Sequence, residues 1–284
     1  MNDQINPPVW FITGCSSGLG RALAGRVLAR GHRLVATARR PEVLNDLAAG
    51  QPAHCRVLPL DVAVPAQVSA TVARAAAAFG RLDVVVNNAG YGLVGAFEEL
   101  SDEQIARNFE TNFFGALRVI RAALPILRAQ RHGHFVNLSA AAVIANYAGF
   151  SSYGATKWAL EGFSESLAAE VRPLGLKVTI VEPGPFRTDF ISRSLERAAS
   201  RIADYDASSG KFLRFLETMS DKQPGDPAKA ADAIIAAVES EMPPLRLVLG
   251  KYAHDKARKK FMSARRELDA WEGVGLATDF TAVS

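Results

Sequence analysis

The sequence predicts an α/β protein: a single doubly wound domain in which helices cover both faces of a parallel sheet. Apolar segments of strand length alternate with helical segments from residue 9 to residue 249. Strands that are buried on both faces of a parallel sheet have unbroken apolar runs of this kind. No repeat or low-complexity linker divides the 284 residues, and a chain of this length can bury one large core. We therefore expect residues 1–284 to form one domain.

The first half of the chain supplies four of the expected strands. Residues 9–12 are a short apolar run, and a glycine-rich turn separates them from a helical pattern over residues 19–30, which Gly31 ends. Further strands are predicted at residues 33–38, 56–60 and 82–86. An alanine-rich helix is expected at residues 64–79, between the third and fourth strands.

The second half of the chain continues the alternation and brings the total to seven strands. A long helical pattern covers residues 101–131, and we expect Pro125 to kink or shorten it. Further helices are predicted at residues 151–171 and 227–241, the latter with Pro227 in its first turn. The remaining strands are predicted at residues 134–138, 176–181 and 245–249.

Two segments depart from the alternation. Residues 186–223 mix aromatic and charged residues and are expected to form short helices beside the sheet, as a lid over the substrate. Residues 252–284 are expected to form a C-terminal helical extension. Its apolar residues recur at steps of four and three from Ala257 to Trp271, so we expect this face to dock on the domain. The alternative is that its many basic residues bind nucleic acid or an anionic surface.

The composition is that of an ordinary globular protein. The net charge is +4 and 22% of the residues are charged. No apolar run reaches the roughly 18 residues of a membrane span, and the polar first residues do not resemble a signal peptide. Cys15 and Cys55 form neither a disulfide framework nor a zinc motif. We expect a cytoplasmic protein without a metal.

A glycine-rich turn follows the first predicted strand and opens the first helix. Its residues are Gly14, Ser16, Ser17, Gly18, Leu19 and Gly20. Glycines allow a tight turn and a close approach of the backbone to a pyrophosphate, and the helix N-terminus supplies N–H donors. The placement predicts dinucleotide binding, although glycines also occur in plain turns.

Arg39 stands at the end of the second predicted strand. A dinucleotide fold that prefers NAD usually has Asp or Glu here to bind the ribose 2′-hydroxyl. Ala38 offers no carboxylate, whereas Arg39 can pair with a 2′-phosphate. The predicted cofactor is therefore NADP(H); the alternative is that Arg39 and Arg40 are solvated loop residues.

Tyr153 and Lys157 lie four residues apart near the start of a predicted helix, so they share one face. The pKa of tyrosine is ordinarily about 10. A nearby ammonium group favours the phenolate and brings tyrosine into the working range of an acid–base catalyst. This spacing alone is common in helices, so the pair gains meaning only from its context.

Two further motifs supply that context: Asn87-Asn88-Ala89-Gly90 after the fourth strand and Pro183-Gly184 after the sixth. With the glycine-rich turn and the Tyr153/Lys157 pair, they make the sequence resemble the short-chain dehydrogenase/reductase family over roughly residues 8–250. The nearest branch includes hydroxysteroid and retinol dehydrogenases. The resemblance implies a single Rossmann-like domain with a seven-stranded parallel sheet, and hydride transfer without a metal.

The resemblance also implies a role for each matching residue. Tyr153 is the acid in reduction and the base in oxidation, and Lys157 holds the nicotinamide ribose. Asn112 supports a proton-relay water. The other implied cofactor contacts are Asp61, Val62, Asn88, Ala89, Gly90, Pro183, Gly184 and Thr188. Structural alternatives exist for Asp61, as a helix cap, and for Asn87, in strand-end hydrogen bonding.

One position departs from the family pattern. The family's serine stands thirteen residues before the tyrosine, where this chain has Ala140, and Ser139 comes one residue earlier. Either the loop at residues 140–150 has one extra residue and Ser139 polarises the substrate oxygen, or the serine role is vacant. We favour Ser139 because oxyanion-type stabilisation contributes strongly to catalysis.

The sequence thus predicts an NADP(H)-dependent oxidoreductase that interconverts a hydrophobic ketone or aldehyde and its alcohol. The residues expected near the nicotinamide are mostly apolar or aromatic: Val94, Phe97, Val143, Ile144, Tyr147, Phe150, Phe186 and Phe190. A non-catalytic NADP-binding sensor or scaffold is the alternative. We expect a homodimer or homotetramer, as the resemblance implies, and no nucleic-acid or membrane partner.

Overall fold

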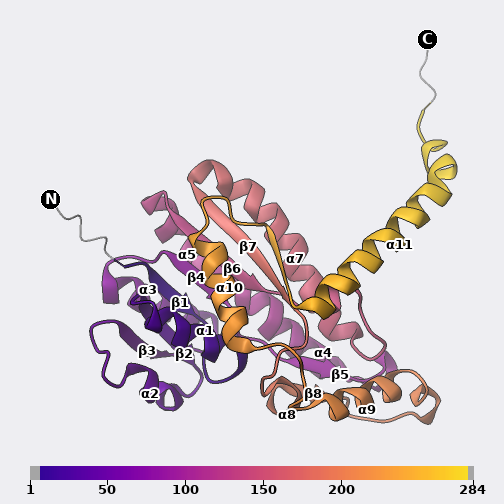
Figure 1. Ribbon diagram of the computed structural model, residues 1–284, viewed down its shortest axis with the longest axis horizontal. Coiled ribbons are helices and arrows are strands. Elements are labelled where there is room, and N and C mark those ends of the chain that lie inside the picture. The colour runs from indigo at the N-terminus through magenta and orange to yellow at the C-terminus, as the bar shows by residue number, and fades with distance from the viewer. Residues whose placement is uncertain (1–6, 281–284) are drawn as a thin grey trace.

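The computed structural model describes residues 7–280, and its centre is a seven-stranded parallel sheet (Figure 1). The strand order is β3-β2-β1-β4-β6-β7-β9. The strands are β1 (Val9–Ile12), β2 (Arg33–Ala38), β3 (Cys55–Pro59), β4 (Val84–Asn87), β6 (Gly133–Leu138), β7 (Leu176–Pro183) and β9 (Arg246–Leu249). The predicted doubly wound α/β fold is confirmed, and each observed strand begins and ends within two residues of its predicted bounds.

Helices cover both faces of the sheet. One face carries α1 (Gly18–Ala29) and α10 (Pro227–Glu239), and the other carries α3 (Pro65–Phe79), α5 (Gly115–Gln130) and α7 (Ser151–Val171). Shorter helices are α2 (Asn45–Ala48) and α6 (Ala141–Ile144). The two layers explain why the strands are mostly apolar: each strand contributes alternate side chains to one face and then the other.

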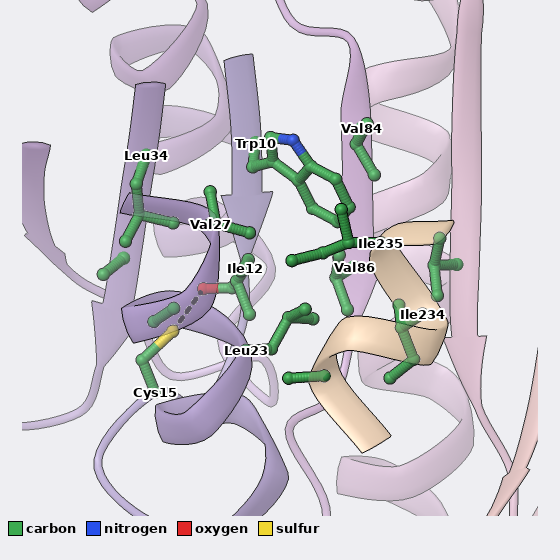
Figure 2. Close-up of a cluster of buried hydrophobic side chains, with 14 of the residues drawn as sticks. Trp10, Ile12, Cys15, Leu23, Val27, Leu34, Val84, Val86, Ile234 and Ile235 are labelled. Carbon is green, nitrogen blue, oxygen red and sulfur yellow. Dashed lines mark hydrogen bonds between the residues drawn. The ribbon is translucent and has the colours of Figure 1, made fainter. Parts of the chain in front are cut away.

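The core beneath α1 and α10 joins distant parts of the chain (Figure 2). Trp10 and Ile12 of β1 face this cluster, whereas Val9 and Phe11 face the opposite one. Figure 2 shows α10 bringing Ile234 and Ile235 over the β1 and β4 side chains. The Sγ atom of Cys15 donates to the carbonyl oxygen of Ile12 at 3.3 Å, and burial raises the pKa of this thiol to about 12.

The long helix predicted at residues 101–131 is interrupted, but not at Pro125. The structure has α4 (Asp102–Phe109), one π-helical turn (Glu110–Phe114) and α5. Pro125 lies inside α5, and the helix continues to Gln130. The expectation that Pro125 shortens the helix is therefore wrong; the irregular turn contains Asn112 and ends at Phe114, eleven residues before Pro125.

A small two-stranded parallel sheet beside the main one was not predicted. It pairs β5 (Gly92–Val94) with β8 (Leu195–Arg197). The lid segment, residues 186–223, contributes β8 and two helices, α8 (Phe190–Arg193) and α9 (Ser209–Met219). This sheet fixes the first part of the lid to the loop that follows β4.

The predicted C-terminal helix forms over most of residues 252–284, of which 281–284 lie outside the described residues, but most of its apolar face does not dock. Helix α11 (Lys251–Leu276) extends away from the domain (Figure 1). Its buried residues, Ala253 and Ala257, lie near its start, whereas Phe261, Leu268 and Trp271 are exposed. The docking expectation is wrong because the helix axis points away from the sheet, so only the first two turns reach the domain.

The described residues, 7–280, contain neither a membrane-spanning helix nor a metal-binding cluster. Within that range, no helix combines the length and the apolar character required to cross a membrane. The same range holds no cluster of three or more His, Cys, Asp or Glu residues placed to bind a metal ion.

Candidate active site

A cavity of about 950 Å³ opens at the carboxyl edge of the sheet. It is lined by the segments that follow β1, β2, β3, β4, β6 and β7. β1 and β4 are adjacent in the sheet, and the connections run in opposite directions from this point, which is where doubly wound folds bind ligands. All the residues predicted for the site line this cavity except Gly20 and Asn112.

The glycine-rich turn fits a dinucleotide pyrophosphate. Gly14 has φ of +71°, and a Cβ atom there would lie 2.9 Å from the Cα of Ala89. A Cβ at Gly20 would overlap the side-chain amide of Asn88. The first turn of α1, with Gly18 and Leu19, faces the cavity. A helix N-terminus behind a turn without side chains is the arrangement that binds phosphate groups.

Asn88 holds the turn in place. Its Nδ2 donates to the carbonyl oxygens of Thr13 at 2.9 Å and Gly14 at 3.0 Å. The Thr13 hydroxyl in turn accepts the N–H groups of Asn88 and Ala89, each at 3.0 Å. The neighbouring Asn87 is structural, because its amide donates to the Asn137 side chain in the sheet at 2.8 Å.

Arg39 and Asp61 line the part of the cavity that follows β2 and β3, where the sequence predicts the adenosine half of the cofactor. Arg39 is exposed at the end of β2 and lines the cavity, where its guanidinium is accessible to an anion. Asp61 also lines the cavity, and its Oδ1 accepts the N–H of Ala63 at 2.9 Å. Helix α3 begins at Pro65 with Val64 as its N-cap residue, so Asp61 stabilises the preceding turn and is not the helix cap.

Tyr153 and Lys157 are buried at the centre of the cavity, in the first two turns of α7. The Lys157 ammonium lies 6.0 Å from the Tyr153 ring centre and donates to the carbonyl oxygen of Leu138 at 2.7 Å. Burial lowers the pKa of Lys157 to about 8, partly offset by the negative charge of Glu161. Burial also raises the pKa of Tyr153. The sequence led us to expect that Lys157 lowers the pKa of Tyr153. In the structure, desolvation has the larger effect and raises that pKa.

Asn112 is buried in the π-helical turn and supports the site from behind. Its Oδ1 accepts the N–H of Tyr91 at 2.9 Å, and its Nδ2 donates to the Tyr91 carbonyl at 2.9 Å and to the Thr156 hydroxyl at 3.2 Å. These bonds connect the loop after β4 to helix α7 between Tyr153 and Lys157. The π-helical turn places the asparagine there, as such turns often do at functional sites.

The hydroxyl of Ser139 points to a buried carboxylate. Its Oγ donates to Oε1 of Glu161 at 2.5 Å, and both residues are buried. Ala140, the position of the family's serine, carries no hydroxyl. This hydrogen bond gives the Ser139 hydroxyl a partner within the protein, while Ser139 also lines the cavity, so both alternatives for the serine role stay predictions.

Glu161 belongs to a charged cluster that the sequence did not reveal. Arg246 of β9 approaches Glu161 at 3.4 Å, Glu182 at 3.5 Å and Glu165 at 2.9 Å. Burial raises the pKa of Glu161 and that of Glu182, the latter to about 7. The members come from α7, β7 and β9, so only the folded chain brings them together behind Lys157.

Aromatic residues form the other end of the cavity. The Tyr147 ring stacks on Phe212 of α9 with centres 4.9 Å apart, and Phe150 lies between Phe212 and Tyr153, at 4.9 and 5.0 Å. The Tyr147 hydroxyl is 2.7 Å from that of Tyr252 in α11. This stack connects the lid and the start of α11 to the catalytic candidate Tyr153.

The expected substrate residues are borne out in part. Four of them line the cavity: Tyr147, Phe150, Phe186 and Phe190. Phe97 is 69% exposed, and Val94, Val143 and Ile144 are buried in the packing. The lining residues not assigned to the substrate region from sequence include Phe212, Phe215, Leu216, Met219 and Tyr252.

Comparison with known proteins places this fold and site in a family. The family model described as short chain dehydrogenase matches residues 8–199. The oxidoreductase BOA17 of Botryotinia fuckeliana is 37% identical, over 95% of this chain and 98% of its own length. The 3-ketodihydrosphingosine reductase of Bacteroides thetaiotaomicron is 34% identical, over 87% of this chain and 89% of its own.

Solved structures agree. A short-chain dehydrogenase from Streptomyces avermitilis is 43% identical with a TM-score of 0.91, covering 98% of this chain and 100% of its own. Serine dehydrogenase in complex with NADP+ is 26% identical with a TM-score of 0.73, covering 85% and 94%. A Burkholderia phymatum protein solved with NAD shares the fold at 23% identity and a TM-score of 0.82, covering 94% and 97%.

The fold and site define a doubly wound, dinucleotide-binding oxidoreductase. More specifically, the chain belongs to the short-chain dehydrogenase/reductase family, whose members act on CH–OH and C=O groups.

Proposed function

We propose that the protein is an NADP(H)-dependent oxidoreductase that interconverts a hydrophobic ketone or aldehyde and its alcohol. The observation that carries this proposal is the set of residues that line one cavity. It joins the glycine-rich turn, the buried pair Tyr153 and Lys157, and the aromatic residues of the lid. The buried free cysteines Cys15 and Cys55 suit a reducing compartment, and we propose the cytoplasm.

Tyr153 acts as the acid when a carbonyl is reduced. NADPH bound at the glycine-rich turn would supply the hydride for the carbonyl carbon. The Tyr153 phenol gives its proton to the carbonyl oxygen, so one O–H bond breaks as that of the alcohol forms. Because burial raises the pKa of Tyr153, the phenol is protonated and ready near neutral pH. The Lys157 ammonium, one turn along α7, offsets the phenolate charge that results.

Arg39 carries the preference for a phosphorylated cofactor. It is exposed at the cavity edge after β2, beside Ala38, which offers no carboxylate for a ribose 2′-hydroxyl. A guanidinium there pairs with a 2′-phosphate. The NADP+ held by serine dehydrogenase supports this choice, whereas the NAD held by the Burkholderia protein keeps NAD as the competing cofactor.

The aromatic end of the cavity favours a hydrophobic substrate. Tyr147, Phe150 and Phe212 offer flat apolar surface next to Tyr153, and apolar pockets of this kind select apolar ligands. The name of the Bacteroides relative, a ketone reductase acting on a sphingoid compound, is consistent with that class.

The test is a panel of ketones, aldehydes and alcohols with NADPH and NADP⁺, run beside NADH and NAD⁺. We expect carbonyl-dependent oxidation of NADPH that is abolished in Tyr153→Phe, while this variant still binds NADPH. Arg39→Ala is expected to raise KM for NADPH more than for NADH. Binding of NADPH without any turnover across the panel would instead support a sensor or scaffold, and a preference for NADH would overturn the role of Arg39.

A further inference from the structure

Helix α11 presents an apolar face that continues beyond the domain. Ala253 and Ala257 on this face are buried against the domain. Further along the same face, Phe261 is 65% exposed, Leu268 71% and Trp271 68%. Monomeric proteins seldom expose several large apolar side chains in one continuous row. We therefore expect another molecule to cover this row.

The spacing of the apolar residues in this row is the one found where two helices pack against each other. Ala257, Ala264 and Trp271 are seven residues apart, and so are Phe261 and Leu268. Apolar residues at alternating steps of four and three make a narrow stripe, the pattern by which two helices pair. We propose that the exposed apolar stripe (Phe261, Ala264, Leu268 and Trp271) pairs with the same stripe of a second copy of the chain, in antiparallel orientation.

Charge determines the orientation. The first part of α11 is basic and the last part acidic. The basic residues are Lys251, Lys256, Arg258, Lys259, Lys260, Arg265 and Arg266; the acidic ones are Asp255, near the start, and Glu267, Asp269 and Glu272. An antiparallel pair sets the basic part of each helix beside the acidic part of the other. A parallel pair in register would instead place Lys260 beside Arg265 and Glu267 beside Glu272, which are like charges.

The stripe also sets a register. When Phe261 of one copy packs against Trp271 of the other, Ala264 packs against Leu268. In the same register the flanking Arg258 meets Glu272, and this contact occurs twice in a symmetric pair. Arg265 and Glu267 then each lie near their own copies at the two-fold axis, and Asp269 of the same helix, 3.7 Å from Arg265, offsets part of the arginine charge. The parallel pair has four such like-charge contacts and no opposite-charge contact to balance them.

A lipid surface fits this helix less well. An anionic membrane attracts basic residues along the whole length of an amphipathic helix. Here Glu267, Asp269 and Glu272 flank the end with the largest apolar residues, Leu268 and Trp271. Those carboxylates are repelled by anionic lipid, whereas they complement the basic half of a second α11.

This pairing has a consequence for the cavity. In the proposed register, the C-terminal end of one helix lies beside the start of the other. Tyr252, in the first turn of α11, lines the cavity and bonds to Tyr147, and Lys256 lies 5.7 Å from the Tyr252 ring centre. The end of each helix thus lies next to the cavity mouth of the other copy.

The first test measures the mass of the full-length protein by light scattering and sedimentation. Leu268→Glu places a charge in the apolar stripe and is expected to halve the mass of the assembly. Met262→Glu introduces the same charge at an exposed residue that lies off the stripe, and it is expected to leave the mass unchanged. These residues are exposed, so both variants should fold like the unaltered chain. An unchanged mass for Leu268→Glu would overturn the proposal.

The second test examines the register by charge exchange. Arg258→Glu and Glu272→Arg, each alone, are expected to weaken self-association by about tenfold or more. The double variant restores the opposite charges and is expected to return to within about threefold of the unaltered chain. If the double variant stays as weak as the single ones, the antiparallel register is wrong. A monomeric unaltered chain that binds phosphatidylserine vesicles would assign the stripe to lipid and overturn the pairing.

Discussion

At the scale of single residues, two glycines of the same helix differ in what a methyl group would meet. A Cβ at Gly20 would overlap the Asn88 amide and lie 2.6 Å from the carbonyl oxygen of Gly14. Gly25, among residues 7–280, has nothing within 4 Å of its Cβ position. Gly20 is therefore required by the close contact of turn and loop, whereas Gly25 is not.

We expect Gly20→Ala to weaken NADPH binding, because the new methyl group displaces the amide that holds the turn, at a cost of about 1–3 kcal/mol. Gly25→Ala is expected to leave binding unchanged and to stabilise the fold by roughly 0.5–1 kcal/mol, since Ala favours the helix. Fluorescence titration with NADPH and thermal unfolding measure the two effects. Equal affinities for the two variants would contradict this account of the turn.

The carboxylate of Glu161 is expected to control the pH dependence of the reaction through Lys157. Burial lowers the pKa of Lys157 to about 8, and the negative charge of Glu161 raises it. Activity that needs the ammonium form therefore falls as pH rises through about 8. Glu161→Gln removes the charge that supports the ammonium, so the fall in kcat/KM is expected to occur at lower pH.

Glu165→Gln is the matched control for that experiment. Glu165 also pairs with Arg246 and lies one turn further along α7, but its side chain is 59% exposed. We expect its pH profile to match that of the unaltered protein. Ser139→Ala removes the hydrogen bond to Glu161 and is expected to shift the profile without abolishing turnover. A loss of turnover of three orders of magnitude would assign the oxyanion role to Ser139 after all.

At the scale of elements, the contact between α1 and α10 combines apolar packing with exposed ion pairs. Ile235 of α10 is fully buried in the cluster of Figure 2. Arg26 binds Asp232 at 2.8 and 2.9 Å, but both side chains are at least one third exposed. Solvent screens such pairs, so they contribute little stability. A cavity in the core removes packing contacts that nothing replaces, so it costs more.

Ile235→Ala is therefore expected to reduce the free energy of unfolding by about 2–5 kcal/mol. Asp232→Asn, in the same helix and the same interface, is expected to have a much smaller effect. Urea unfolding followed by circular dichroism gives both values. Comparable losses for the two variants would mean that the ion pairs, and not the packing, hold α10 in place.

The same contrast explains which elements could be predicted. The seven strands of the main sheet are mostly apolar over four to eight residues, so the local sequence predicts their burial. Strands β5 and β8 have three residues each, which is too short to show an alternating apolar pattern. The two strands are also about 100 residues apart in the sequence. The periodicity of α11 correctly predicted a helix with one apolar face, but a pattern within one helix does not specify what covers that face.

At the scale of the whole molecule, the site residues were predictable because of the topology. Most of the motifs directly follow a strand, and the carboxyl ends of parallel strands meet at one edge of the sheet. The orientation of Ser139 was not predictable, because its partner Glu161 lies on α7 and is balanced by Arg246 of β9 and Glu182 of β7. Three distant elements decide where that hydroxyl points.

His134 in the central strand β6 is expected to limit stability in acid. It is buried beside Thr179, and burial lowers its pKa to about 4. The folded protein keeps this ring neutral, whereas the unfolded chain takes up a proton below about pH 6.5. Stability from this group is thus lost as pH falls from 6.5 towards 4, by up to about 3 kcal/mol.

Glu182 acts in the opposite direction. Its pKa is raised to about 7, so between about pH 4.5 and 7 the folded state holds a proton that the unfolded chain has released, and stability from this group declines as pH rises. We expect His134→Gln to reduce the loss of stability between pH 6.5 and 4, measured by urea unfolding at several pH values. The exposed His254, changed to Gln, is expected to leave that slope unaltered; a slope unaltered in His134→Gln would show that another group dominates.

The position of α10 over β1 and β4 affects how the chain folds as it is made. Trp10 and Val84 emerge from a ribosome long before Ile234 and Ile235, the residues that cover them. Until about 240 residues have been synthesised, the part of this face that α10 covers stays open to water, to chaperones and to other nascent chains. Folding of the cofactor domain is consequently a late event in translation, and a fragment that ends near residue 199 retains an uncovered apolar face.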